Sequence, residues 1–159
     1  MSGKVLVAVF SASGVTKRVG QEIARISDGD FFEIIPEEIY TAKDLDWTDN
    51  KSRSSVEMND PVSRPAIKNK VSNISEYETV IIGFPIWWGI APRIIDTFLE
   101  SYDFSGKTIV PFCTSGGSGV GHSDTELHKY VKGSVKWEKG VQINRPNESE
   151  IRKMLKKVL

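Results

Sequence analysis

The apolar run Val5-Leu6-Val7-Ala8-Val9-Phe10 leads directly into the polar loop Ser11-Ala12-Ser13-Gly14-Val15-Thr16. Six consecutive apolar side chains are typical of a parallel strand that is buried on both faces. Residues 15–26 then place Val15, Val19, Ile23 and Ile26 at helical spacing. A buried strand, a short polar loop and an amphipathic helix together indicate the first unit of a parallel α/β sheet.

The same alternation of apolar runs and amphipathic segments continues along the chain. We expect four further strands, over residues 31–35, 79–84, 108–113 and 135–143, the last one interrupted by a turn at Lys139-Gly140. Helices are expected to start at Pro92, at Ser123 with Glu126, and at Asn147 with Glu150. The chain is therefore predicted to form one α/β domain over residues 1–159, a three-layer sandwich with a parallel sheet between two helical layers.

Two places fit this pattern less well. Residues 37–64 are long for a loop without structure, so we expect short helices near residues 42–47 and 51–58, with Thr41 and Asp44 as a capping pair. Pro111 lies inside the apolar run 108–113, although a proline has no N–H to donate within a sheet.

The composition limits the possible partners. The 159 residues carry 21 Lys and Arg against 21 Asp and Glu, and this balance argues against nucleic-acid binding or an anionic-membrane anchor. The apolar run near the start is too short for a signal peptide or a membrane span, so we expect a cytoplasmic protein. One cysteine and two histidines show no metal-site spacing.

The first loop is suited to a phosphate. Ser11, Ser13 and Thr16 offer hydroxyls, Gly14 lets the backbone approach closely, and the helix that follows presents unpaired N–H groups. The simpler alternative is that Ser13 only caps the helix. Neither the P-loop pattern nor the glycine-rich dinucleotide pattern occurs here, so a nucleoside triphosphate or a dinucleotide bound in the usual manner is not expected.

Two further loops follow buried strands, and the carboxyl ends of such strands meet at one ligand-binding edge. In Pro85-Ile86-Trp87-Trp88-Gly89, adjacent side chains diverge, so at least one tryptophan should face this edge and offer a stacking surface. The alternative is that both cover the core. Trp47 and Trp137 are expected to be packing residues.

The third loop, Ser115-Gly116-Gly117-Ser118-Gly119, supplies small residues and amide donors. By itself this pattern also suits an ordinary turn. Cys113 before it suggests a phosphatase nucleophile, but the sixth residue after it is Gly119 and not an arginine. We therefore expect Cys113 to be a small buried core residue.

These three loops, read with the flanking Gly83-Phe84 and Thr114, resemble the flavodoxins, and the resemblance extends over essentially the whole chain. It implies a flavodoxin-like, five-stranded parallel sheet in the order 2-1-3-4-5 and one noncovalent FMN. By motif position the cofactor-binding residues would fall into three groups. The phosphate would be held by Ser11, Ala12, Ser13, Gly14, Val15 and Thr16. The isoalloxazine would be flanked by Pro85, Ile86, Trp87, Trp88 and Gly89, and its pyrimidine edge by Ser115, Gly116, Gly117, Ser118 and Gly119.

The chain differs from the family in three respects. It has Ser13 where the usual phosphate loop has threonine, its net charge is zero, and its third loop has no aromatic residue to cover the second flavin face. That face is either open or covered by another segment, such as residues 40–58.

The leading hypothesis is an electron-transfer flavoprotein that serves redox partner proteins. The second is an FMN-dependent NAD(P)H oxidoreductase acting on a quinone or a similar small-molecule acceptor. The third is a cofactor-free interaction domain.

Overall fold

The central sheet has the strand order that the resemblance to the flavodoxins implied. The computed structural model describes residues 4–115, 126–131 and 133–158. Its strands run in the order β2-β1-β3-β4-β5, with β6 pairing β4 beyond β5, and the pairings between these strands are parallel. The strands are β1 Lys4–Val9, β2 Asp30–Glu33, β3 Tyr77–Pro85, β4 Thr108–Thr114, β5 Lys136–Trp137 and β6 Val141–Gln142.

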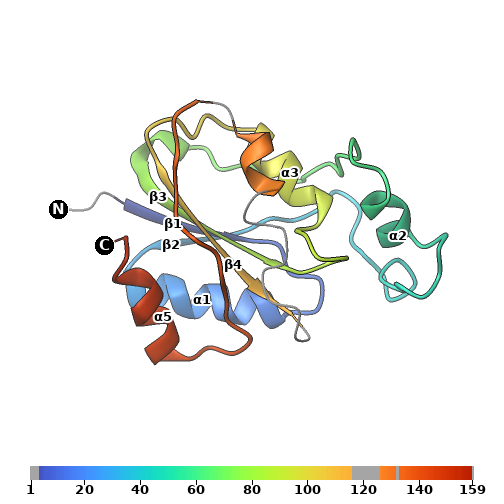
Figure 1. The fold of residues 1–159 in the computed structure, drawn as a ribbon, viewed down its shortest axis with the longest axis horizontal. Coiled ribbons are helices and arrows are strands. Elements are labelled where there is room, and N and C mark those ends of the chain that lie inside the picture. The colour runs from blue at the N-terminus through green and yellow to red at the C-terminus, as the bar shows by residue number, and fades with distance from the viewer. Residues whose placement is uncertain (1–3, 116–125, 132, 159) are drawn as a thin grey trace.

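Helices cover both faces of this sheet (Figure 1). The helices α1 and α5 pack on one face, while α3 and the 3-10 helix η2 pack on the other. Alternate side chains of β1 point to opposite faces of the sheet. Val5, Val7 and Val9 belong to the core under α1 and α5, while Leu6 and Ala8 belong to the core under α3 and η2. The helical elements are α1 Val15–Ser27, α2 Arg53–Met58, η1 Ile74–Glu76, α3 Arg93–Glu100, η2 Leu127–Tyr130 and α5 Glu148–Leu155.

The structure explains how β4 tolerates Pro111. Backbone N–H groups of Glu138 and Ile143 donate to the carbonyls of Ile109 and Cys113, both at distances near 3 Å. Pro111 lies midway between these two acceptors, opposite the interruption that separates β5 from β6. Its nitrogen therefore faces the place where no strand pairs with β4 among the described residues, and the missing N–H costs no ladder hydrogen bond.

Several expected element boundaries need correction. Residues 42–47 form turns and not a helix, although Thr41 and Asp44 exchange the two expected hydrogen bonds at 3.0 and 3.1 Å. β2 ends at Glu33, before Ile34 and Ile35. The predicted helix start at Ser123 lies outside the described residues. At the last helix Asn147 is the N-cap as predicted, and its side chain accepts from the Glu150 N–H at 3.1 Å.

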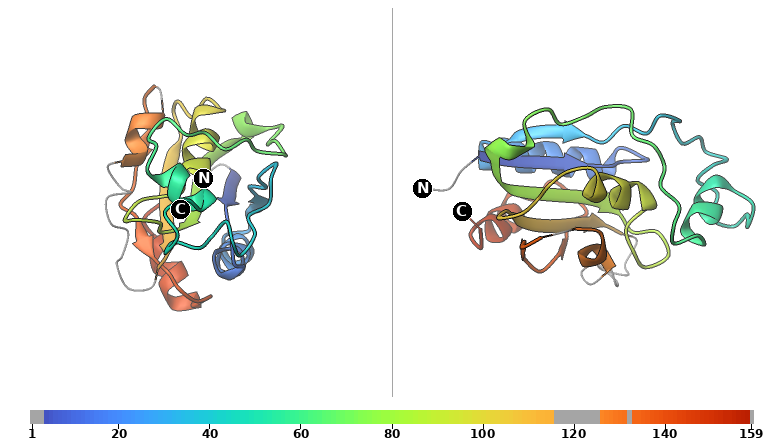
Figure 2. Two further views of the ribbon diagram at one scale, coloured as in Figure 1. Left: turned by 90° about the vertical axis from the view of Figure 1, so that its right-hand side faces the viewer. Right: turned by 90° about the horizontal axis from the view of Figure 1, so that it is seen from above.

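Residues 37–66 form a lobe beyond the carboxyl ends of the strands. Its two ends are held together. The Glu37 N–H donates to Ala66 O at 2.9 Å, and Pro36 and Ile67 form an isolated antiparallel β-bridge. Figures 1 and 2 show this lobe, which contains α2, projecting from one end of the sheet. Within the described ranges, no helix is long and apolar enough to cross a membrane.

Candidate functional site

The first loop ends in an open helix N-terminus. Gly14, and not Ser13, is the N-cap of α1; it has φ 93°, and Ser13 is exposed and makes no capping hydrogen bond. Ser11 Oγ instead accepts from the Gly14 N–H at 3.0 Å, which closes the loop on itself. The alternative in which Ser13 merely caps the helix is therefore wrong, because glycine in a left-handed conformation makes the turn.

The geometry of this loop suits an anion. The first intrahelical bond is from Arg18 N–H to Gly14 O at 3.1 Å, so the preceding N–H groups of Val15, Thr16 and Lys17 have no acceptor within the helix. Apart from its own chain neighbours, no described residue has an atom within 4 Å of the place where a side chain of Gly14 would begin. A phosphate could approach these N–H groups closely, with the helix dipole in its favour.

The second loop is a tight turn with a tryptophan at its tip. Trp87 and Ile90 exchange backbone hydrogen bonds at 2.9 and 3.2 Å, while Trp88 and Gly89 have φ values of 51° and 82°. Positive φ at both central positions is the property of a type I′ turn. Gly89 adopts this conformation readily, whereas for a bulky residue such as Trp88 it is strained.

The two tryptophans have different environments. Trp87 packs edge-on against Phe10 and Tyr40, with ring centroids 5.8 and 5.5 Å apart. Trp88 is 49% exposed. Trp87 is therefore partly buried against the core, whereas the Trp88 side chain is accessible from solvent. Ile86 and Pro85 before them are half-buried.

Thr114, the last residue of β4, joins the three loops. Its hydroxyl lies 2.8 Å from the hydroxyl of Thr16, and its carbonyl accepts from the Ile86 N–H at 3.0 Å. The next residue, Ser115, donates its N–H to Asn144 Oδ1 at 2.9 Å. Gly116, Gly117, Ser118 and Gly119 lie outside the described residues. The described parts of the three predicted loops are thus brought to one edge of the sheet.

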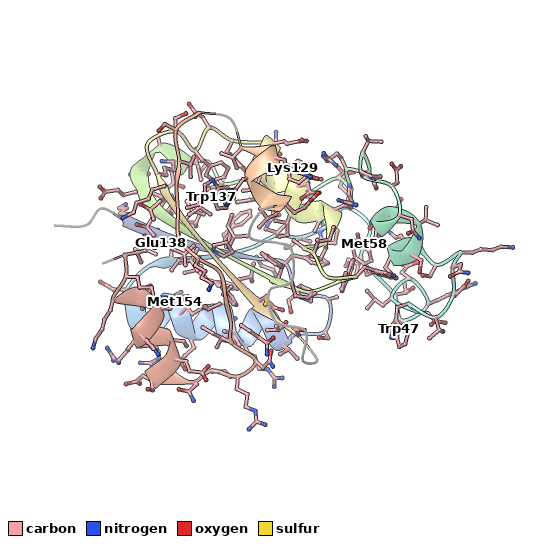
Figure 3. All side chains as sticks on the ribbon, viewed as in Figure 1. Trp47, Met58, Lys129, Trp137, Glu138 and Met154 are labelled. Atoms are coloured by element: carbon pink, nitrogen blue, oxygen red, sulfur yellow. The ribbon has the colours of Figure 1, made fainter. Side chains whose placement is uncertain are left out.

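A pocket of about 330 Å³ lies beside Trp88, between the second loop and the 37–66 lobe. Its described lining residues are Leu45, Trp47, Ser54, Ile86, Trp87 and Trp88. The expectation that Trp47 is a packing residue is wrong, since this side chain is 73% exposed. Figure 3 shows Trp47 on the lobe, while Met58 lies between α2 and the sheet. The only feature of the sequence that could have indicated an exposed Trp47 is its polar neighbours, Asp46 and Thr48.

A polar cluster fixes the lobe against Trp87. The Tyr40 hydroxyl donates to Glu57, and Arg53 lies over the Tyr40 ring at 3.8 Å while it pairs with Glu57 at 2.9 Å. Burial and the hydrogen bond to Glu57 raise the pKa of Tyr40 above its ordinary value. Tyr40 therefore stays protonated and keeps donating this hydrogen bond. Arg53 and Glu57 are therefore partly buried in this cluster and do not belong to a solvated face, since only 20% and 12% of their side chains are exposed.

Other reactive side chains give no competing site in the described part of the chain. Cys113 is fully buried in the core between β4 and the helices, as expected. No group of three or more His, Cys, Asp or Glu side chains there could hold a metal ion.

The strand order and the loops at one edge define a flavodoxin-like α/β protein. More specifically, the family model described as Flavodoxin matches residues 4–158, and the chain belongs to this family. Among solved structures, a candidate flavoprotein from Bacteroides eggerthii is 50% identical over 98% of both chains, with a TM-score of 0.93. Another from Bacteroides uniformis is 49% identical over 98% of this chain and 99% of that one, with a TM-score of 0.91.

A more distant structure shares the fold. A flavoprotein from Lactobacillus acidophilus, solved in complex with FMN, is 21% identical over 97% of this chain and 99% of that one, with a TM-score of 0.71. The comparison with curated proteins found no match.

Proposed function

We propose that this flavodoxin-family protein holds one noncovalent FMN at the loop edge and transfers electrons between redox partners. FMN binding follows from the family match over residues 4–158, and the related Lactobacillus acidophilus flavoprotein was solved with FMN. The single observation that carries the proposal is the pairing of Thr16 with Thr114 at 2.8 Å. Because Thr114 also accepts from the Ile86 N–H at 3.0 Å, the open helix N-terminus and the loop of Trp88 lie next to each other.

The residues present fit the cofactor. The N–H groups of Val15, Thr16 and Lys17 would hold the phosphate, and the Trp88 indole would pack against the ring. Backbone groups of the Trp88-Gly89 turn would lie beside that ring, where a hydrogen bond would tune its electronics. When bound, the flavin supplies the redox chemistry, while the protein orients it and limits its contact with water.

The partner we propose is a protein with a basic docking surface. The whole chain is neutral, but residues 37–66 carry seven acidic and four basic side chains. The large hydrophobic side chains exposed in the described ranges also lie on this lobe or at the second loop: Ile39, Trp47, Val56, Val62 and Trp88. We therefore expect association with such a partner to slow as salt concentration rises.

The second candidate function is an FMN-dependent NAD(P)H oxidoreductase. The observation that favours it is the pocket between Trp47 and Trp88, which a small acceptor could enter from solvent. Steady-state NAD(P)H oxidation by the FMN-loaded protein, with menadione as acceptor, distinguishes the two functions. The carrier predicts negligible turnover until a flavodoxin reductase is added, and rapid turnover without it would establish the enzyme instead.

A further inference from the structure

The chain leaves the sheet at Ser115, the first residue of the third loop. Just before it, Cys113 O accepts from the Ile143 N–H at 2.9 Å, as in a parallel ladder. The next bond of that ladder would run from the Ser115 N–H to the Ile143 carbonyl. The Ser115 N–H donates instead to Asn144 Oδ1 at 2.9 Å. A side chain thus takes the place of the backbone acceptor where the loop begins.

Asn144 is held on both sides along the chain. Ile143 before it is buried in the core under α1 and α5. After it, the Asn147 N–H donates to Arg145 O at 2.7 Å, and the Asn147 side chain caps α5. The backbone at Asn144 therefore has a fixed place, and its side-chain oxygen is a fixed acceptor for the loop.

Different parts of the chain fix two consecutive residues at the start of the third loop. Thr114 is held by Thr16 at the start of α1 and by Ile86 in the second loop. Asn144 adds a contact to Ser115 from the segment between β6 and α5. Together these bonds set the direction in which the chain leaves β4.

Packing does not explain the amide side chain at position 144, because Asn144 is exposed. An aspartate there could accept the same hydrogen bond but would add a negative charge, whereas the asparagine amide accepts without one. We propose that Asn144 is a positioning residue of the flavin site. It fixes the start of the third loop, and thereby the amide donors that this loop offers to the pyrimidine edge. This inference rests on the proposed function.

Three variants of the apoprotein, titrated with FMN and with riboflavin, test this role. Asn144→Ala should weaken FMN binding about three- to tenfold, the size expected for one lost hydrogen bond. Riboflavin binding should fall by the same factor, because the third loop is assigned to the ring and not to the phosphate. Asn147→Ala is the matched control. It removes the cap of α5 three residues away, and should lower the urea midpoint while leaving FMN affinity unchanged.

The third variant, Asn144→Asp, separates positioning from a general loss of stability through two further readouts. In the apoprotein, the Ser115 amide proton should exchange with solvent faster in Asn144→Ala than in the wild type, and slowly again in Asn144→Asp, which keeps an acceptor. With FMN bound, Asn144→Asp should have a more negative midpoint potential than the wild type, because its carboxylate opposes the electrons gained by a nearby ring.

Unchanged FMN affinity in Asn144→Ala, or an equal loss in Asn144→Ala and Asn147→Ala, would overturn the assignment. An unchanged midpoint potential in Asn144→Asp would overturn it as well. A wild-type protein that binds no FMN would refute the proposed function together with this role, while exchange of the Ser115 amide would still report the hydrogen bond itself.

Discussion

Trp88 has an unfavourable backbone conformation and a side chain that is not buried in the core. Its φ is 51°, and nearly half of the residue is exposed. A bulky residue in the left-handed region costs about 1–3 kcal/mol, and such strain is concentrated at functional sites. The position is therefore one where stability and ligand binding favour different side chains.

Replacement of Trp88 by asparagine should separate these two effects. Asparagine tolerates the left-handed conformation, so Trp88→Asn should change the free energy of unfolding by less than about 1 kcal/mol. FMN affinity should fall about tenfold through loss of the stacked ring. Urea unfolding and FMN titration measure the two quantities.

Trp87→Ala provides the contrast, because Trp87 packs against Phe10 and Tyr40. Removal of this ring should cost about 3 kcal/mol of stability. If Trp88→Asn destabilises the protein as much as Trp87→Ala does, then Trp88 is a structural residue and its assignment to the ligand is wrong.

Asp96 is a buried carboxyl at the base of the lobe. It lies 3.5 Å from Arg93 and 4.0 Å from Arg64. The Arg93 guanidinium donates to the carbonyl of Met58, the last residue of α2, at 3.0 Å. Burial raises the pKa of Asp96 to about 7, although both arginines act in the opposite direction and Glu126 adds a small further increase. Near neutral pH, Asp96 therefore changes charge next to the attachment of the lobe.

This pKa predicts a pH dependence of stability. Between pH 4 and 7 the folded protein keeps a proton on Asp96 that the unfolded chain has released, so the contribution of this group to stability decreases as pH rises and levels off above pH 7. Urea unfolding of Asp96→Asn should show a flatter pH dependence than the wild type across this window. Parallel curves for the two proteins would contradict the raised pKa.

At the scale of elements, β3 and β4 meet too closely for a side chain at Gly83. A Cβ on Gly83 would overlap the Phe112 ring and would lie 2.8 Å from Val9 Cγ1. Phe112 is fully buried and Val9 is in the core, so neither side chain has free space to move into.

We expect Gly83→Ala to destabilise the protein by about 3 kcal/mol through overpacking. The urea midpoint should fall while the secondary structure of the remaining folded protein is retained. An unchanged urea midpoint would contradict this structure, because it would mean that β3 and β4 can move apart to make room for the added methyl group.

The elements themselves were largely predictable because their signals are local. Continuous apolar runs identified the buried strands, helical spacing identified α1, and the start signals at Pro92 and Asn147 indicated α3 and α5. The interruption of the last strand near Gly140 was also visible. The sequence did not show that this interruption lies opposite Pro111. That alignment depends on the register between β4 and its neighbours, which sequence periodicity does not reveal.

At the scale of the whole molecule, the lobe was the part that the sequence described least well. Its turns are fixed by side chains such as Asp46 and by the distant Arg93, and such contacts leave no periodic pattern. The loops of the candidate site were predicted because each follows a buried strand. The exposure of Trp47 was not predicted, because it depends on how the lobe is placed relative to the second loop.

The joining of the loops by Thr114 was missed for a related reason. Its partner Thr16 is 98 residues away in the sequence. Only the parallel pairing of β1, β3 and β4 brings them together.

The central claim is that the start of α1 holds a phosphate while Trp88 packs against the ring attached to it. Titration of the apoprotein with FMN and with riboflavin tests this directly, because the two ligands differ only by the phosphate. The account predicts one tightly bound FMN per chain and riboflavin binding at least about 100-fold weaker, as expected for the loss of charge-assisted hydrogen bonds. Equal affinity for the two, or no binding of either, would contradict it.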